Sequence, residues 1–249
     1  MRLLFLGDIH GHFSVIHNHI DKFELKNAHI IQVGDFGVGF SSFKKDKRNL
    51  EMYHKKLVKN NIFLWVIRGN HDYKPYFDND PFGFSNIKLV KDYTVLDLCG
   101  KKILCVGGAI SVDRENRKSK YQKQGDFSKI TGAESWWPDE VFNLEKETLL
   151  NLKGVDTVVT HTTPSYCPPD NTFGFGNFID NIVKNNNDET LKSDLLFERH
   201  QASELFTLLK INNDIENAYY GHFHRSEYIT MYGTKHRLLN INELWEEPY

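Results

Sequence analysis

The sequence Gly7-Asp8-Ile9-His10-Gly11 follows a short apolar run, residues 3–6, which is typical of a buried strand. Asp8 and His10 are two residues apart, so on an extended backbone their side chains point the same way. A carboxylate oxygen and an imidazole nitrogen on one face provide half of a metal site. This interpretation predicts that further ligands follow other strands of the fold.

Later apolar runs also end in polar motifs, which read Gly34-Asp35, Gly69-Asn70-His71-Asp72, Thr160-His161 and Gly221-His222-Phe223-His224. Ligands of open α/β sheets collect outside the carboxyl ends of the strands, where all of these motifs stand. Each motif alone is a weak signal, because a Gly-Asp pair is usually a turn and a single histidine is usually a satisfied polar residue. Together they predict a metal site made of Asp8, His10, Asp35, Asn70, His161, His222 and His224.

The pattern of apolar residues predicts alternating strands and helices in the first third of the chain, which favours a parallel α/β layer. We expect strands at 2–6, 29–33, 62–67, 155–160 and 217–220, hairpins at 93–106 and 228–241, and helices at 12–24, 42–60, 138–152 and 194–210. The segment 73–86 is predicted to be a loop, and the polar segment 111–137 is predicted to be a long loop over the site.

Composition limits the class of protein. The 249 residues contain no linker that separates two parts, so we predict a single domain, 1–249, and 40% apolar residues suffice for a core. The net charge of −2 argues against long nucleic acid as a partner, although a nucleotide fits. We predict a cytoplasmic protein, because the three cysteines form no CxxC pattern and the sequence shows no signal peptide. We also predict no membrane partner, because no apolar run approaches the ~20 residues of a membrane span.

The motifs, in this order, resemble those of the calcineurin-like metallophosphoesterase superfamily. The matching blocks are GDIHG at 7–11, GD at 34–35, GNHD at 69–72, TH at 160–161 and GHFH at 221–224. The resemblance implies an α/β fold with four layers, an αββα sandwich of two mixed β-sheets flanked by helices. It also implies two metal ions bridged by Asp35, one held by Asp8, His10 and His224 and the other by Asn70, His161 and His222.

The chemistry that the resemblance implies is hydrolysis of phosphate mono- or diesters. A hydroxide that bridges two divalent ions attacks phosphorus, and His71, next to the ligand Asn70, protonates the leaving group as general acid. Asp72 either orients His71 or is a turn residue of the loop. Histidine and carboxylate ligands suit manganese, iron, zinc or cobalt, and we expect manganese to support activity in vitro.

The second block departs from that of the protein serine/threonine phosphatases in this superfamily, which reads GDxVDRG. Val38 stands where the aspartate that orients the catalytic histidine would be, and Gly39 stands where a phosphate-binding arginine would be. We therefore expect substrate contacts elsewhere, and the candidates are Arg68, Arg114, Arg117, Arg225 and His12. For each arginine, a solvated surface role is the alternative, and for His12 the alternative is that it only begins the helix that follows.

Other functions remain open at this point. The alternative substrates are a phosphoprotein, a dinucleoside polyphosphate, a cyclic nucleotide or a nucleic-acid end. The alternative from another class is a binding scaffold that keeps the fold without catalysis. Such a scaffold usually lacks ligands or the acid histidine, and here all of them are present.

Overall fold

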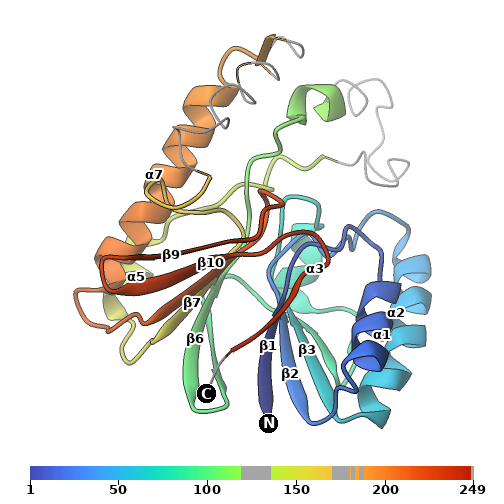
Figure 1. Ribbon diagram of the computed structural model, residues 1–249. Coiled ribbons are helices and arrows are strands. Elements are labelled where there is room, and N and C mark those ends of the chain that lie inside the picture. Colours follow the sequence, from blue (N-terminus) through green and yellow to red (C-terminus); the bar gives the residue numbers. More distant parts are fainter. Residues whose placement is uncertain (119–135, 170–179, 181–182, 185–187, 248–249) are drawn as a thin grey trace.

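The computed structural model describes residues 1–118, 136–169, 180, 183–184 and 188–247 (Figure 1). One sheet has the strand order β11-β1-β2-β3-β4, in which β1 to β4 are parallel and the edge strand β11 is antiparallel. Its strands are β1 (Arg2–Leu6), β2 (Ala28–Gln32), β3 (Ile62–Val66), β4 (Ile87–Leu89) and β11 (Leu244–Glu246).

The second sheet has the order β5-β6-β7-β8-β10-β9, in which β6, β7, β8 and β10 are parallel and both edge strands are antiparallel. Its strands are β5 (Thr94–Leu98), β6 (Lys101–Val106), β7 (Thr157–Thr160), β8 (Asn217–Tyr220), β9 (Glu227–Met231) and β10 (Thr234–Leu238). Both sheets are therefore mixed, as expected.

Successive side chains of a strand point to opposite faces of its sheet, and this alternation separates two layers of apolar contacts. In β1, Leu4 and Leu6 pack with the helices on one face, whereas Leu3 and Phe5 lie in the core between the two sheets. The outer face of the first sheet is covered by α1 (Ser14–Lys22) and α2 (Phe43–Lys59), and that of the second by α5 (Lys146–Asn151) and α7 (Leu191–Leu209) (Figure 1). The predicted four-layer αββα sandwich is confirmed.

Some local predictions were wrong. Of the helix expected at 138–152, only α5 (Lys146–Asn151) is present. The backbone before it is not helical, because the Arg68 guanidinium donates hydrogen bonds to the carbonyls of Asp139, Glu140 and Val141. The predicted loop 73–86 contains α3 (Lys74–Asn79), with Pro75 in its first turn. The polar segment predicted as a loop is helical at 114–118, and its residues 119–135 lie outside the described part.

Candidate metal centre

The predicted ligands meet where strands of both sheets end. Asp8 and Asp35 follow β1 and β2, and His161 and His222 follow β7 and β8. Their donor atoms form two groups, Asp8, His10, Asp35 and His224 in one and Asp35, His161 and His222 in the other, each with its atoms within 4.8 Å of one another. Asp35 is common to both groups, as a bridging ligand must be.

The first group is open on one side. Asp8 is buried and Oδ2 of its carboxylate lies 3.1 Å from Nε2 of His224, whose side chain is 40% exposed. The same His224 atom lies 3.0 Å from Nε2 of His10. Two imidazole nitrogens and a carboxylate oxygen thus face a common point, which is the donor set expected for a divalent transition metal.

The second group is buried. Nε2 of His161 lies 3.2 Å from Oδ1 of Asp35 and 3.1 Å from Oδ1 of Asn70. The other ring nitrogen of His161, Nδ1, donates to the carbonyl of Val33 at 2.8 Å. That bond places a proton on Nδ1, so Nε2 is the ring nitrogen that faces Asp35 and Asn70. Burial lowers the pKa of His161, but the charge and hydrogen bond of Asp35 outweigh it and raise that pKa to about 9, so a metal ion on Nε2 would replace a proton.

Two residues without a predicted role fix the amide of Asn70. Nδ2 of Asn70 donates to the Ser111 hydroxyl at 2.9 Å, and this hydroxyl donates to the buried Glu140 carboxylate at 2.8 Å. Oδ1 of Asn70 is thereby turned toward His161. The role of Ser111 and Glu140 was missed, since nothing in the sequence shows that two residues so far apart meet behind a ligand.

The backbone at the site is strained and closely packed. His10, Asp35, His222 and His224 all have left-handed backbone angles, with φ of 44°, 56°, 69° and 52°. Such angles are uncommon for residues other than glycine and cluster at functional sites. The glycines beside the ligands leave room for them, because a Cβ on Gly34 would lie 2.3 Å from Nδ1 of His161, and one on Gly221 would lie 2.2 Å from Oδ1 of Asp8.

These residues fit two divalent cations. Nε2 of His222 is buried and has no hydrogen-bond partner among the described residues, so its lone pair is available. Burial and the neighbouring His161 lower the pKa of His222 well below its ordinary value. Burial raises the pKa of Asp35, but His71, His161 and His10 outweigh it and hold that pKa well below the ordinary value. A neutral imidazole and an ionised carboxylate are the forms that bind metals.

His71 lies at the mouth of this centre. Its Nε2 is 3.9 Å from Oδ2 of Asp35, and its ring contacts those of His10 and Phe40 edge to face. The guanidinium of Arg117 lies against the imidazole, with Nη2 2.7 Å from Nε2 and Nη1 3.1 Å from Nδ1. Burial lowers the pKa of His71 to about 4, Asp35 opposes this shift and Arg117 adds to it.

Of the two interpretations of Asp72, the structure favours the loop role. Its buried carboxylate accepts hydrogen bonds from the backbone amides of Phe36, Gly37, Val38 and Gly69, at 2.7–3.2 Å. These bonds tie the loop after Asp35 to the loop that carries Asn70. Asp72 therefore positions two loops that carry predicted metal ligands, and within the described part of the chain its carboxylate accepts hydrogen bonds from these amides rather than from the imidazole of His71.

The structure places the five candidate substrate-contact residues in different surroundings. Arg117 reaches the site, whereas Arg68 is buried and pairs with Asp92 at 3.0 Å. Arg114 pairs with Asp188 and Asp194 at 2.6 and 2.7 Å, which holds the helical turn at 114–118 against the start of α7. His12 is exposed at the start of the first helix. Arg225 is 3.5 Å from Glu227 on the surface.

The loop after Asp35 has no space for the arginine of the protein phosphatase pattern. A Cβ on Gly39 would lie 2.3 Å from Cβ of Tyr73. Val38, at the position of the missing aspartate, is fully buried in the core beneath the first sheet. The packing of this loop therefore requires a glycine at position 39 and keeps Val38 in the core, where the protein phosphatase pattern has an arginine and an aspartate.

Comparison with known proteins agrees with this geometry. The family model described as calcineurin-like phosphoesterase matches residues 1–226. The chain belongs to this family. No curated protein sequence matches it. The family's characteristic two-metal centre agrees with the two donor groups that share Asp35.

Solved structures resemble the chain at low sequence identity. The crystal structure of TT1561 of Thermus thermophilus has a TM-score of 0.53 and 9% identity, over 97% of this chain and 91% of that chain. A phosphopantetheinyl hydrolase (PptH) from Mycobacterium tuberculosis has a TM-score of 0.42 and 13% identity, over 97% and 90%. The first likeness supports the fold, and the second carries no further conclusion.

Among the described residues, the helices are too short or too polar to span a membrane.

Proposed function

We propose that this calcineurin-like phosphoesterase hydrolyses phosphate mono- or diesters with two divalent metal ions, and that manganese supports the reaction in vitro. The observation that carries the proposal is the sharing of Asp35 by two donor groups, with His71 facing their common side. When bound, two such ions supply positive charge for the phosphoryl oxygens and acidify a water molecule.

The chain's own residues provide the remaining contacts. Two guanidinium nitrogens of Arg117, Nη1 and Nη2, lie at the mouth of the site. A guanidinium can donate two parallel hydrogen bonds to two oxygens of one phosphoryl group. We assign it as the substrate-binding arginine, in place of the one absent at Gly39. His71, beside Arg117 and Asp35, is the group within reach of a leaving oxygen, and a bound substrate anion favours its protonated form.

The substrate is a small phosphoester in this proposal. The arginine and aspartate that mark phosphoprotein phosphatases are absent, and the loop at Gly39 excludes the arginine sterically. A scaffold without catalysis would not need His71 and all the ligands at one place. A nucleotide ester is within the substrate class. Long nucleic acid is disfavoured, because the protein's net charge of −2 does not attract a polyanion.

The test is an assay of p-nitrophenyl phosphate and its bis ester with manganese, iron, zinc or cobalt added in turn. We expect metal-dependent release of nitrophenol from at least one ester, and none from Asp35→Asn prepared alongside. A protein that binds two metal ions and hydrolyses neither ester, nor any other in a panel of mono-, di- and cyclic phosphoesters, would overturn the proposal in favour of a scaffold.

A further inference from the structure

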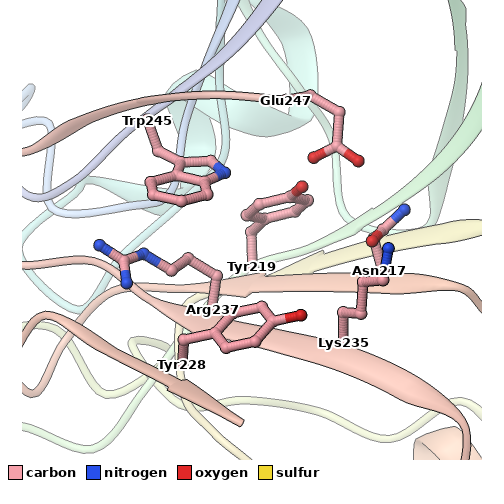
Figure 2. A pocket seen from close by; sticks show the side chains of 7 residues that line it. All are labelled: Asn217, Tyr219, Tyr228, Lys235, Arg237, Trp245 and Glu247. Atoms are coloured by element: carbon pink, nitrogen blue, oxygen red, sulfur yellow. The ribbon is translucent and has the colours of Figure 1, made fainter. Parts of the chain in front are cut away.

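In the pocket between the edges of the two sheets, several side chains contact one another (Figure 2). The Arg237 guanidinium lies 4.4 Å from the centroid of the Trp245 ring and forms an ion pair with Glu243. Tyr219 stacks on Phe5 of the core at 3.5 Å between ring centroids. Charge without a partner is concentrated elsewhere on the molecule, on the surface of α2.

α2 is much more basic than the rest of the chain. It contains seven lysine or arginine residues and two acidic residues, whereas the whole chain has a net charge of −2. One of the two acids, Asp46, is buried and accepts a hydrogen bond from the backbone amide of Gly39 at 2.9 Å. The other, Glu51, is exposed. The exposed surface of α2 therefore carries a strong excess of positive charge.

Four of these cations form a stripe along the outward face of α2. At 3.6 residues per turn, positions 44, 48, 55 and 59 fall within about 60° of one another around the helix axis and extend about 22 Å along it. Leu50 and Leu57, which are buried, lie on the opposite side of the helix. All four cations are exposed, and none forms an ion pair or a side-chain hydrogen bond with another described residue; they are Lys44, Arg48, Lys55 and Lys59.

The nearest acids of α1 do not neutralise this stripe. Asp21 pairs with a different lysine, Lys56, at 2.5 Å. Asp21 and Glu24 line a groove of about 650 Å³ between the ends of the two helices, and four lysines line the same groove, namely Lys26, Lys55, Lys56 and Lys59. Positive charge therefore exceeds negative charge at this end of the stripe as well.

Exposed apolar side chains flank the stripe on both sides. Met52 is 57% exposed and Val58 is 47% exposed, and at 100° per residue they lie about 50° and 70° from the middle of the stripe, in opposite directions. The phosphates of a nucleic acid would pair with the cations but would leave both apolar side chains in water. A lipid surface offers anionic headgroups and hydrocarbon together, which matches both kinds of side chain.

We propose that the outward face of α2 docks this protein on an anionic phospholipid surface. The four cations contact the headgroups, while Met52 and Val58 enter the boundary between headgroups and acyl chains. Clusters of four to eight lysine or arginine residues on a helix are typical of binding to acidic lipids. The absence of a membrane span does not oppose this, because a helix that lies on the surface needs none.

The position of the stripe relates it to the metal centre. α2 follows the loop that begins with Asp35, and the ring of Phe40 in this loop lies 5.7 Å from that of His71 between centroids. Lys44 is the second residue of the helix, so the stripe begins at the end of α2 that is nearer to the metal centre. A docked α2 therefore holds the metal centre close to the lipid surface.

The test measures the partitioning of the full chain onto sedimented vesicles, made either of phosphatidylcholine alone or of equal parts of phosphatidylcholine and phosphatidylserine. Excess inorganic phosphate is present, so that lipid phosphate does not bind through the metal centre. We expect partitioning onto the acidic vesicles that weakens as salt is added. The triple variant Lys44→Gln, Lys55→Gln, Lys59→Gln should weaken it by roughly 100-fold, since each cation contributes about fivefold.

The matched control is the triple variant Lys91→Gln, Lys102→Gln, Lys153→Gln. It makes the same charge change at exposed lysines away from α2, which form no ion pair with another described residue. It should partition like the unaltered protein. Met52→Gln should weaken partitioning by roughly fivefold, from partial burial of the side chain, and should keep the salt dependence.

The proposal is overturned by absence of partitioning onto the acidic vesicles or by equal partitioning of the two triple variants. It is also overturned if the unaltered protein binds a single-stranded thymidine oligonucleotide in a manner that the three α2 lysines support, while Met52→Gln leaves vesicle partitioning unchanged. These outcomes are independent of the proposed hydrolysis, since catalysis is not measured.

Discussion

The amide of Asn70 donates to the hydroxyl of Ser111 at 2.9 Å, and this single bond determines which atom of the amide faces the metal centre. An asparagine can present either its oxygen or its nitrogen to a neighbour, and only the oxygen binds a metal ion. The carboxyl group of the buried Glu140 accepts a hydrogen bond from the Ser111 hydroxyl and so fixes the direction of both bonds. A predicted metal ligand is therefore oriented by two residues that are outside the predicted ligand set.

Ser111→Ala should weaken the binding of the second metal ion by roughly 10- to 100-fold, the usual cost of removing a group that orients a ligand. The backbone amide of Ser111 still donates to Glu140 in this variant, so the loop keeps its anchor. Calorimetric titration with manganese measures the effect. Ser193→Ala, at an exposed position of α7, is the control, and equal affinity in both variants would remove Ser111 from the account.

His71→Ala should lower turnover by roughly 10²–10⁴, the range for loss of a general acid, while the bound metal stays at its normal amount. The measurements are the turnover number and the metal content of the same preparation. His200→Ala, which removes an exposed imidazole of α7, should leave turnover unchanged. Unchanged turnover in His71→Ala would exclude His71 from the mechanism.

Arg117→Ala should raise KM by roughly 10- to 150-fold, because a hydrogen bond to a charged group contributes roughly 1.5–3 kcal/mol. Arg114→Ala serves as the comparison, since it removes the same guanidinium three residues away. Its ion pairs with Asp188 and Asp194 predict a lower melting temperature, and because they hold the turn that carries Arg117, a smaller rise in KM than that of Arg117→Ala. Steady-state kinetics and thermal unfolding separate the two effects, and the reverse pattern would show that the assignments are exchanged.

Stability should depend on pH through Glu198, a buried residue of α7. Burial raises its pKa from 4.5 to about 7, and the nearby Thr162 hydroxyl and the charge of His161 oppose this shift only in part. The folded state then holds a proton that the unfolded state has released, so the stabilisation is complete below pH 4.5 and is lost as the pH rises to about 7. The size is roughly 3 kcal/mol, from 1.36 kcal/mol per pKa unit.

Denaturant unfolding at pH 4.5 and pH 8 tests this in comparison with Glu198→Gln. The free energy of unfolding of the unaltered protein should fall more steeply toward pH 8 than that of the variant, because the amide does not titrate. Parallel curves for the two proteins would mean that Glu198 titrates at the same pH in both the folded and the unfolded state.

The grouping of Asp8, His10, Asp35, His161, His222 and His224 in space could be predicted because strand ends are local signals. An apolar run followed by glycine and a ligand, as at Gly34-Asp35, indicates both the end of a strand and the edge where the site forms. Parallel strands bring such ends together, and the structure places Asp8 and His224, more than two hundred positions apart, 3.1 Å from each other.

The supporting residues could not be predicted, because their partners come from other segments. Arg68, next to a ligand motif, has the charge of a phosphate-binding residue, yet it is buried against the carbonyls of Asp139 and Glu140. Asp72 directly follows His71 but bonds the backbone of the loop at Gly37. The strand β11 contains only three residues, and it forms by pairing with β1 rather than from its own pattern.

The most direct test of the account is the number of manganese ions bound per chain, measured by elemental analysis in the unaltered protein and in Asp35→Asn. Asp35 contributes to both donor groups, so its replacement removes the charge that both ions share. We predict two equivalents in the unaltered protein and less than one in Asp35→Asn. Two full equivalents in Asp35→Asn, or none in the unaltered protein, would contradict the shared metal centre.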